Sequence, residues 1–369
     1  MGTEGDGPRE PVYSRGMSDI KGALLGLLTL PGMTRSLSFL MRDRAAIFML
    51  HRFSDPERGI RGEDEPEALR QALAFLRRER FQLLSLEEVF RRLGGEGPPL
   101  ERAVAFTLDD GTIDQALVAA PIFAEFDCPA TTFVVTGYLD GKLWLWWDKI
   151  EHVFEATDRR ALRVTLGGEE IGYQWEDAAG RARAITDFTE RCKRVADGEK
   201  HAAIERLAAE AGVELPALPP LRYAPMSWDD LRACEARGMS FGPHTVTHPI
   251  LARTEDAQSE QEIQGSWERL SAEARRPVPI FCPPNGLVHD YGAREMVTLE
   301  RLGLRGAVLA SPPRYADAAS FRSSPEARFR VPRVDFTDDL AYLARTVSGA
   351  RRLREIVPRR SPRGDRLVG

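Results

Sequence analysis

The chain has 369 residues, of which 43% are hydrophobic and 29% charged, so it is long and apolar enough to bury a large core. This composition excludes a disordered, collagen-like or multi-span membrane protein, and a net charge of -5 does not indicate a nucleic-acid binder. The 4 cysteines lie far apart without a C-x-x-C pair, which excludes a disulfide framework and a thiolate zinc module.

Residues 1–44 are interpreted as an N-terminal extension. Their apolar run at 22–30 is about half of the roughly 20 residues that span a bilayer, and acidic residues precede it where a signal peptide carries basic ones. The sequence therefore favours a cytoplasmic protein. The leucine-rich stretch can form a helix packed on the core or, alternatively, a peripheral contact with the inner face of the membrane.

From residue 45 onward, short apolar runs alternate with helical patterns, which predicts an α/β fold with buried parallel strands. Strands are expected at residues 45–50, 103–108, 131–135, 239–242, 278–282, 306–310 and 329–334. Helices are expected at residues 66–80, 113–126, 255–275 and 291–302, and after the N-caps Ser85 and Ser227.

Residues 138–224 interrupt this alternation. The stretch contains Trp144, Trp146 and Trp147, a hairpin-like Gly-Gly pair and a charged helical pattern over 181–211. We interpret it as a mainly helical insertion in a catalytic domain of residues 45–345. The arginine-rich tail at 346–369 is expected to be solvated, and the alternative is attraction to anionic lipid.

Acidic and imidazole side chains follow two of the predicted strands. Asp109 and Asp110 come directly after the strand at 103–108, and His244 and His248 begin the element after the strand at 239–242. On a helical turn, two histidines four residues apart point the same way and can share a metal. One carboxylate with two imidazoles leaves a coordination position for water, as in hydrolytic metal sites. Taken alone, each motif also fits a helix start, a turn or a solvated helix face.

Three motifs taken together carry a family resemblance. The sequence TLDDG at 107–111 resembles a T-F-D-D-G motif, HTVTH at 244–248 matches H-[ST]-x-x-H, and FCPPNG at 281–286 is similar to F-x-Y-P-x-G. On these motifs the sequence is identified as a member of the polysaccharide deacetylases of the NodB-homology type, carbohydrate esterase family 4. The resemblance implies a distorted (β/α) barrel and a metal-dependent hydrolase that removes N-acetyl groups from amino sugars of a polysaccharide or lipid-linked glycan.

The resemblance also implies residue roles. Asp109 is expected to be the general base, and Asp110, His244 and His248 are expected to bind a divalent metal ion, with Zn²⁺ favoured over Co²⁺ and Ni²⁺. In this arrangement the ion polarises the acetamide carbonyl while the base takes a proton from water. Family membership further suggests an N-acetylated glycan such as N-acetylglucosamine polymer as substrate, and a place in exopolysaccharide biosynthesis.

Two departures from the family pattern require substitutes. Cys282 stands where many members have an arginine that orients the catalytic aspartate, and Arg333 is the predicted replacement, with a surface ion pair as its alternative role. The late histidine that protonates the leaving amine is missing. His51, in a segment similar to the N-terminal motif of poly-N-acetylglucosamine deacetylases, is the predicted general acid, and His289 is the competing candidate. His152 and His201 are not expected to take part.

Two other functions remain open on the sequence alone. One is hydrolysis of a different carbon–nitrogen bond, as in deformylases and cyclic amidases, and the other is glycan binding without catalysis. The tryptophans of the insertion can stack on pyranose rings, or they can form the core of the insertion.

Overall fold

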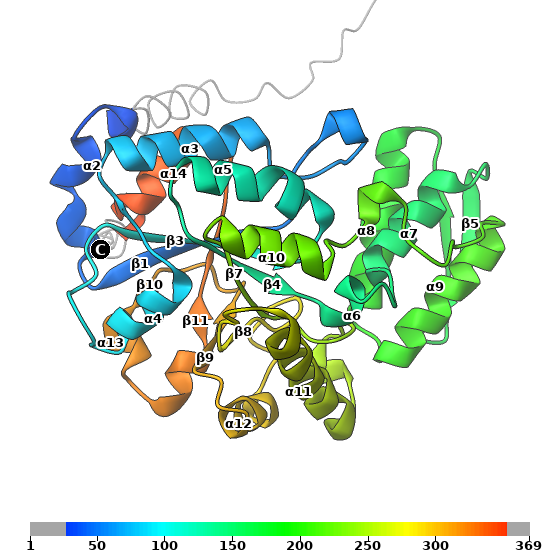
Figure 1. Ribbon diagram of the computed structural model, residues 1–369. Coiled ribbons are helices and arrows are strands. Elements are labelled where there is room, and N and C mark those ends of the chain that lie inside the picture. Colours follow the sequence, from blue (N-terminus) through cyan, green and yellow to red (C-terminus); the bar gives the residue numbers. More distant parts are fainter. Residues whose placement is uncertain (1–26, 353–369) are drawn as a thin grey trace, which may run out of the picture.

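The core of the protein is a parallel sheet of mostly apolar strands. The computed structural model describes residues 27–352, and this sheet runs through its centre (Figure 1). The central strands, in their spatial order, are β1 (Arg44–Leu50), β3 (Ala103–Asp110), β4 (Ala130–Val134) and β7 (Ser240–Pro243). Neighbours in this order are parallel, and every residue of β3 and β4 is buried. Because such strands are covered on both faces, they need the continuous apolar runs that predicted them.

Shorter strands continue the sheet and curl it into a distorted barrel. They are β8 (Ile280–Phe281), β9 (Gly306–Leu309), β11 (Val331–Pro332) and β12 (Val334–Asp335), with β2 (Gln82–Leu83) and β10 (Ala316–Asp317) beside β3 and β1. The backbone N–H groups of Val278 and Cys282 donate to carbonyls of β7, so β8 follows β7 in space. β11 pairs with β9 and β12 pairs with β1. The segment 331–335 therefore closes the barrel, which confirms the predicted α/β fold.

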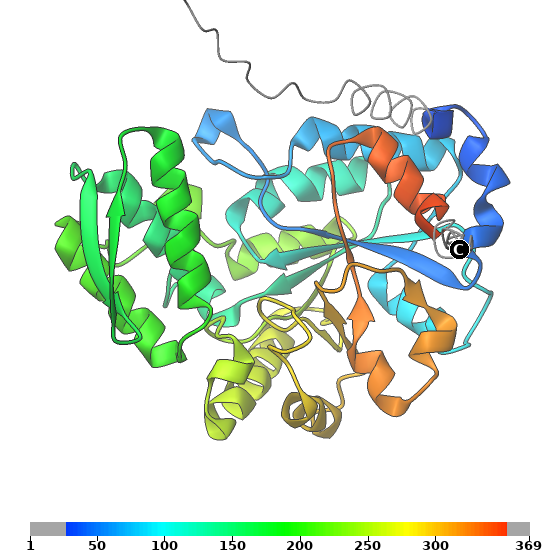
Figure 2. The same cartoon turned by 180° about the vertical axis from the view of Figure 1, so that it is seen from behind.

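Helices cover the outside of the barrel (Figures 1 and 2). They are α2 (Met33–Ser36), α3 (Pro66–Arg78), α4 (Leu86–Leu93), α5 (Ala120–Glu125), α6 (Thr136–Leu139), α10 (Trp228–Ala236), α11 (Asp256–Glu273), α12 (Ala293–Arg301), α13 (Ala318–Phe321) and α14 (Leu340–Val347). Both predicted N-caps are confirmed: the hydroxyls of Ser85 and Ser227 accept hydrogen bonds from the first turns of α4 and α10.

The insertion forms a separate lobe, at the right of Figure 1 and the left of Figure 2. Its elements are α7 (Trp146–Ala156), β5 (Ala161–Leu166), β6 (Glu169–Gln174), α8 (Ala178–Cys192) and α9 (Asp197–Ala211). These elements share one hydrophobic cluster, which includes Phe154, Leu162 and Phe188. The lobe lies beside the carboxyl ends of β3 and β4, which places it next to the motifs that carry the chemistry.

Some expected elements are interrupted in the structure. The last strand, expected over 329–334, is divided at Arg333 into β11 and β12. The helical stretch 181–211 belongs to two helices, and the helix at 113–126 begins with π-helical turns at Gln115–Ala119. Arg333, at the break between β11 and β12, directs its side chain to Asp109.

The N-terminal stretch contributes to the core only in part. Leu40 and Met41 are buried, whereas Leu27, Leu30 and Phe39 are exposed. Residues 1–26 and 353–369, which include Leu24, Leu25 and most of the arginine-rich tail, lie outside the described residues. Among the helices of residues 27–352, none combines the length and the apolar character needed to cross a membrane.

Candidate active site and metal centre

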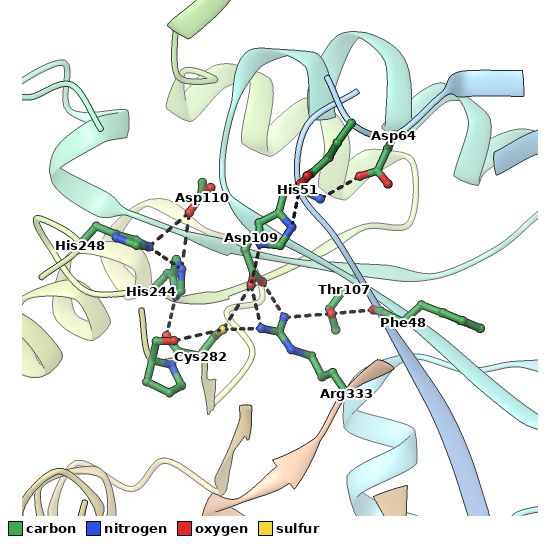
Figure 3. Close-up of polar contacts among 12 residues, drawn as sticks. Phe48, His51, Asp64, Thr107, Asp109, Asp110, His244, His248, Cys282 and Arg333 are labelled. Carbon is green, nitrogen blue, oxygen red and sulfur yellow. Dashed lines mark hydrogen bonds and ion pairs between the residues drawn. The ribbon is translucent and has the colours of Figure 1, made fainter. Parts of the chain in front are cut away.

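Side chains from several strand ends meet in one cavity at the carboxyl edge of the barrel (Figure 3). The cavity has a volume of about 660 Å³, and the residues predicted from the sequence all line it: His51, Asp109, Asp110, His244, His248 and Arg333. His51 follows β1, the two aspartates end β3, and His244 follows β7. In parallel α/β folds this edge is where loops gather functional groups, and the strand order accounts for the convergence.

Asp110, His244 and His248 form a compact triangle of ligand atoms. The Nε2 atoms of the two histidines lie 3.2 Å apart, and Asp110 Oδ1 lies 3.6 Å from His244 Nε2 and 3.5 Å from His248 Nε2. Four ligands at about 2.0–2.2 Å around a tetrahedral zinc ion would be about 3.3–3.6 Å from one another. The three side chains are buried and already stand at that spacing. Their arrangement fits a divalent ion.

The hydrogen bonds of the imidazoles support the same assignment. His244 Nδ1 lies 2.6 Å from the carbonyl oxygen of Cys282, so this nitrogen donates its proton to that oxygen and Nε2 is the ring nitrogen that faces the triangle. Burial lowers the pKa of His248 to about 3, which leaves that imidazole in the neutral form that binds metals. A carbonyl that orients a histidine in this way is a common feature of metal centres.

The two histidines do not lie on a helical turn, so that part of the sequence interpretation is wrong. Residues 244–248 form a loop in which Thr245 and His248 have φ values of 68° and 61°. Glu262 on α11 holds this loop: its carboxylate accepts hydrogen bonds from the backbone N–H groups of Val246 and Thr247, both at 2.8 Å. The Thr245 hydroxyl accepts from His248 N at 3.0 Å. These contacts stabilise a left-handed backbone that brings both rings together.

Asp109 is held by a buried arginine. Both oxygens of its carboxylate accept hydrogen bonds from the two terminal nitrogens of Arg333 at 2.7 Å, and Arg333 is only 1% exposed. Arg333 also donates to Thr107 Oγ1 at 3.1 Å. Burial alone would raise the pKa of Asp109, but the Arg333 guanidinium outweighs burial and holds that pKa well below its usual range. Arg333 therefore does not form a surface ion pair, and Asp109 is ionised.

Cys282 occupies the space beside this ion pair. Its sulfur lies 3.2 Å from Arg333 Nη2 and 3.7 Å from Asp109 Oδ2. Burial raises the pKa of the Cys282 thiol, so the side chain is a neutral neighbour of the pair. The departure from the family motif at Cys282 is thus accompanied by an arginine that reaches the same carboxylate from the barrel-closing segment.

His51 faces Asp109 from the opposite wall. Its Nε2 lies 3.8 Å from Asp109 Oδ2, and its Nδ1 lies 3.3 Å from Glu63 Oε1. The backbone N–H of His51 donates to Asp64, and its carbonyl accepts from Gln115. These hydrogen bonds hold the backbone of His51 in place. Its ring is half-buried and lines the cavity, so it is open to a ligand.

The other histidines lie away from this centre. His289 is exposed, with its Nε2 3.7 Å from Asp290 Oδ1, and it does not line the cavity. His152 packs against Trp144 and Tyr223, and His201 lies 3.8 Å from Asp197. The structure therefore places His51, rather than His289, where a proton donor would meet a ligand.

The tryptophans take both of the roles considered from the sequence. Trp144 and Trp146 are buried, and Trp146 belongs to the hydrophobic cluster of the insertion. Trp146 and Trp147 both line the cavity, and the Trp147 ring packs edge-on against His248 with centroids 4.6 Å apart. The insertion thus supplies an aromatic wall directly beside the metal centre.

Sequence reasoning missed an ion pair that joins the insertion to the barrel. Arg52, next to His51, donates to both carboxylate oxygens of Asp148, next to Trp147, at 3.0 and 2.9 Å. It also missed Glu262, because nothing in the sequence of a helix indicates which distant loop its carboxylate will contact. The sequence signal for Asp148 is the position of this acid directly after two tryptophans.

Comparisons with known proteins identify the family of the chain and support its fold. The sequence profile described as Polysaccharide deacetylase matches residues 96–306, more than half of the chain. A comparison with curated proteins finds no match. Among solved structures, the deacetylase PplD of Streptococcus pyogenes in complex with acetate is 18% identical, with a TM-score of 0.51 over 85% of this chain and 99% of that one. A polysaccharide deacetylase from Bacillus cereus is 13% identical, with a TM-score of 0.50 over 83% and 69%. At these identities the structures support the fold.

Proposed function

Because this chain belongs to the polysaccharide deacetylase family, a family of hydrolases, we propose that it removes N-acetyl groups from amino sugars of a glycan and releases acetate. We further propose that a divalent ion, Zn²⁺ in the first instance, binds at Asp110, His244 and His248. The observation that carries both proposals is the triangle of ligand atoms, 3.2–3.6 Å on each edge, beside an ionised Asp109.

Three side chains of the cavity have distinct parts in the proposed reaction. A divalent ion, when bound, polarises the acetamide carbonyl and acidifies water. Asp109 takes the proton of the attacking water, and Arg333 keeps that carboxylate ionised and oriented. His51 donates a proton to the sugar nitrogen as the carbon–nitrogen bond breaks. The products are acetate and the free amino sugar. One water molecule is consumed: its oxygen becomes part of acetate, and the sugar nitrogen gains a proton.

Metal-dependent acetate release tests this function. We expect protein loaded with one equivalent of Zn²⁺ to release acetate from N-acetylglucosamine oligomers, and chelator-treated protein or the loaded Asp109→Asn variant to release at least about 10²-fold less. Because the ion binds the folded state, loading should also stabilise the protein, by about 2.7 kcal/mol at a hundredfold excess over Kd. Acetate release that is unaffected by chelation, or hydrolysis of formylated or cyclic amides alone, would contradict the proposal.

The role of His51 predicts a dependence on the leaving group. His51→Ala should lower acetate release from N-acetylglucosamine oligomers by about 10²-fold or more, because an amine leaves only with a proton. Hydrolysis of 4-nitrophenyl acetate should change much less, because its phenolate leaves without one. His289→Ala is the matched control and should alter neither rate, since His289 lies outside the cavity. Equal losses on both substrates in His51→Ala would show that His51 is not the acid.

A further inference from the structure

The two strands that carry the proposed acid and the proposed base stop pairing just before these residues. β1 and β3 run parallel, and their register ends at Leu50 and Leu108. His51 and Asp109 each come one residue later, and their side chains lie 3.8 Å apart between His51 Nε2 and Asp109 Oδ2 (Figure 3). Beyond Leu50 and Leu108, the spacing of the two backbones therefore depends on other contacts.

A buried glutamine joins the two backbones at this point. The Nε2 atom of Gln115 donates to the carbonyl oxygen of His51 at 2.6 Å and to the carbonyl oxygen of Asp109 at 2.5 Å. A primary amide nitrogen carries two hydrogens, so it can serve both carbonyls at once. Gln115 is fully buried, and among residues 27–352 its Oε1 atom has no hydrogen-bond partner. Within that range, the side chain makes its hydrogen bonds to His51 and Asp109 only.

The neighbouring Asp114 holds the same loop. Its Oδ2 atom accepts a hydrogen bond from the backbone N–H of Phe53 at 2.6 Å, and Asp114 is buried. Both acid and amide stand where the backbone after β3 becomes π-helical, over Gln115–Ala119, an irregularity that is frequent at functional sites. Two consecutive buried side chains thus connect residues 51–53 to the segment that follows the catalytic aspartates.

We propose that Gln115 is a positioning residue, which sets the separation of the proposed acid and the proposed base by binding the carbonyl oxygen of each. The proposal rests on the proposed function, because that function gives His51 and Asp109 their roles. It deepens that function by assigning a part in it to a residue that does not line the cavity. Water and the sugar nitrogen must meet the base and the acid in one geometry, and a misplacement of about 1 Å can lower a rate by about 10²-fold.

Kinetics of Gln115→Met test this role, because methionine fills a similar space without an amide. For N-acetylglucosamine oligomers we expect kcat to fall about ten- to hundredfold and KM to change by less than about twofold. In the His51→Ala background, Gln115→Met should lower kcat by no more than about threefold, because the separation from the acid no longer matters and Arg333 still holds Asp109. A merely structural loss would lower kcat equally in both backgrounds.

Thr131→Val is the matched control. It removes a buried hydrogen bond, between the hydroxyls of Thr131 and Ser240, and Thr131 does not line the cavity. Thr131→Val should leave kcat and KM unchanged. If Gln115→Met does not fold, Gln115→Asn takes its place with the same expected loss, because it keeps the amide and shortens its reach by one methylene group.

A crystal structure of the Gln115 variant gives a readout that does not depend on activity. The separation of His51 Nε2 and Asp109 Oδ2 should exceed 3.8 Å by about 1 Å. An unchanged separation, or equal losses of kcat with and without His51, would overturn the positioning role. If the parent protein releases no acetate from any glycan, the proposed function fails, and the separation in the crystal still decides whether Gln115 positions the two residues.

Discussion

Replacing Arg333 by methionine is expected to cost about 3–5 kcal/mol in the free energy of unfolding, because it leaves the Asp109 carboxylate buried without its partner. Both residues are almost completely buried, and two hydrogen bonds of 2.7 Å join them. The same change should lower kcat/KM for acetate release by at least about 10²-fold, because a carboxyl group that has taken up a proton cannot act as a base.

A double variant separates the structural role of Arg333 from its role in positioning the base. Asp109→Asn/Arg333→Met removes both charges. The double variant should therefore be less destabilised, relative to the parent protein, than the single variant Arg333→Met. Its activity should stay at the level of Asp109→Asn. Denaturant unfolding and kcat/KM measured on the four proteins give the comparison, and a double variant as unstable as Arg333→Met would contradict the ion-pair argument.

The pH dependence has a defined sign. Since the folded-state pKa of Asp109 is lowered, its ionisation stabilises the parent fully above the ordinary aspartate pKa of about 4, and this contribution is lost as the pH falls through the folded-state pKa. Without Arg333, burial acts unopposed by that cation and the carboxyl takes up its proton at a higher pH. The stability difference between parent and Arg333→Met should therefore shrink as the pH is lowered.

Much of the barrel, and the convergence of Asp110, His244 and His248, could be predicted because local patterns determine them. Continuous apolar runs mark strands that are buried on both faces, and the acids at the end of β3 follow such a run directly. The proximity of His244 and His248 was predicted, but their conformation was not. A spacing of four residues fits a helical turn, and only the distant Glu262 shows that a loop with two left-handed residues is stabilised instead.

His51 and Arg333 were predicted from the family resemblance, and local patterns alone do not show that both reach Asp109. Both lie outside residues 96–306, the part that matches the family profile, and they come from the first strand and the barrel-closing segment. The parallel pairing of β1 with β3 brings His51 beside Asp109, and the pairings of β12 with β1 and of β11 with β9 bring Arg333 there. Likewise, adjacent tryptophans have the same composition signal, yet Trp146 packs inside the insertion and Trp147 against His248, because a helix turns neighbouring side chains about 100° apart.

The ion pair between Arg52 and Asp148 is the second place where a single substitution should have a large effect. Asp148 is 1% exposed and Arg52 is partly exposed, so the two partners are not equivalent. Arg52→Met should lower the free energy of unfolding by about 3–5 kcal/mol at pH 8, because the Asp148 carboxylate stays buried without a charged partner. Asp148→Asn should cost less, because the Arg52 side chain can turn toward solvent.

Arg52→Met should also displace His51 and Trp147, the two residues that flank the ion pair. His51 precedes Arg52, and Trp147, which contacts His248, precedes Asp148, so the pair sets the distance between the proposed acid and the aromatic wall. We expect kcat/KM of Arg52→Met to fall about ten- to hundredfold at a pH where the variant is still folded. A change in Trp147 fluorescence would report the displacement independently of activity. The Trp147 signal is obtained as the difference between spectra of proteins with and without the Trp147→Phe substitution.

The effect of pH on Arg52→Met follows from the burial of Asp148. Burial raises the pKa of Asp148 to about 6 even though Arg52 opposes it, so removal of Arg52 should raise that pKa further. A raised carboxyl pKa means that the folded state binds a proton more tightly than the unfolded state does. Stability therefore falls as the pH rises, by about 1.4 kcal/mol per pH unit between the unfolded-state and the folded-state pKa. Arg52→Met should therefore be less destabilised at pH 5 than at pH 8.

Arg61→Met is the matched control, because it breaks the exposed contact between Arg61 and Glu155 of the insertion. It should cost at most about 1 kcal/mol in the free energy of unfolding at either pH. An equal loss of stability in Arg52→Met and Arg61→Met would show that the burial of Asp148 is not the cause.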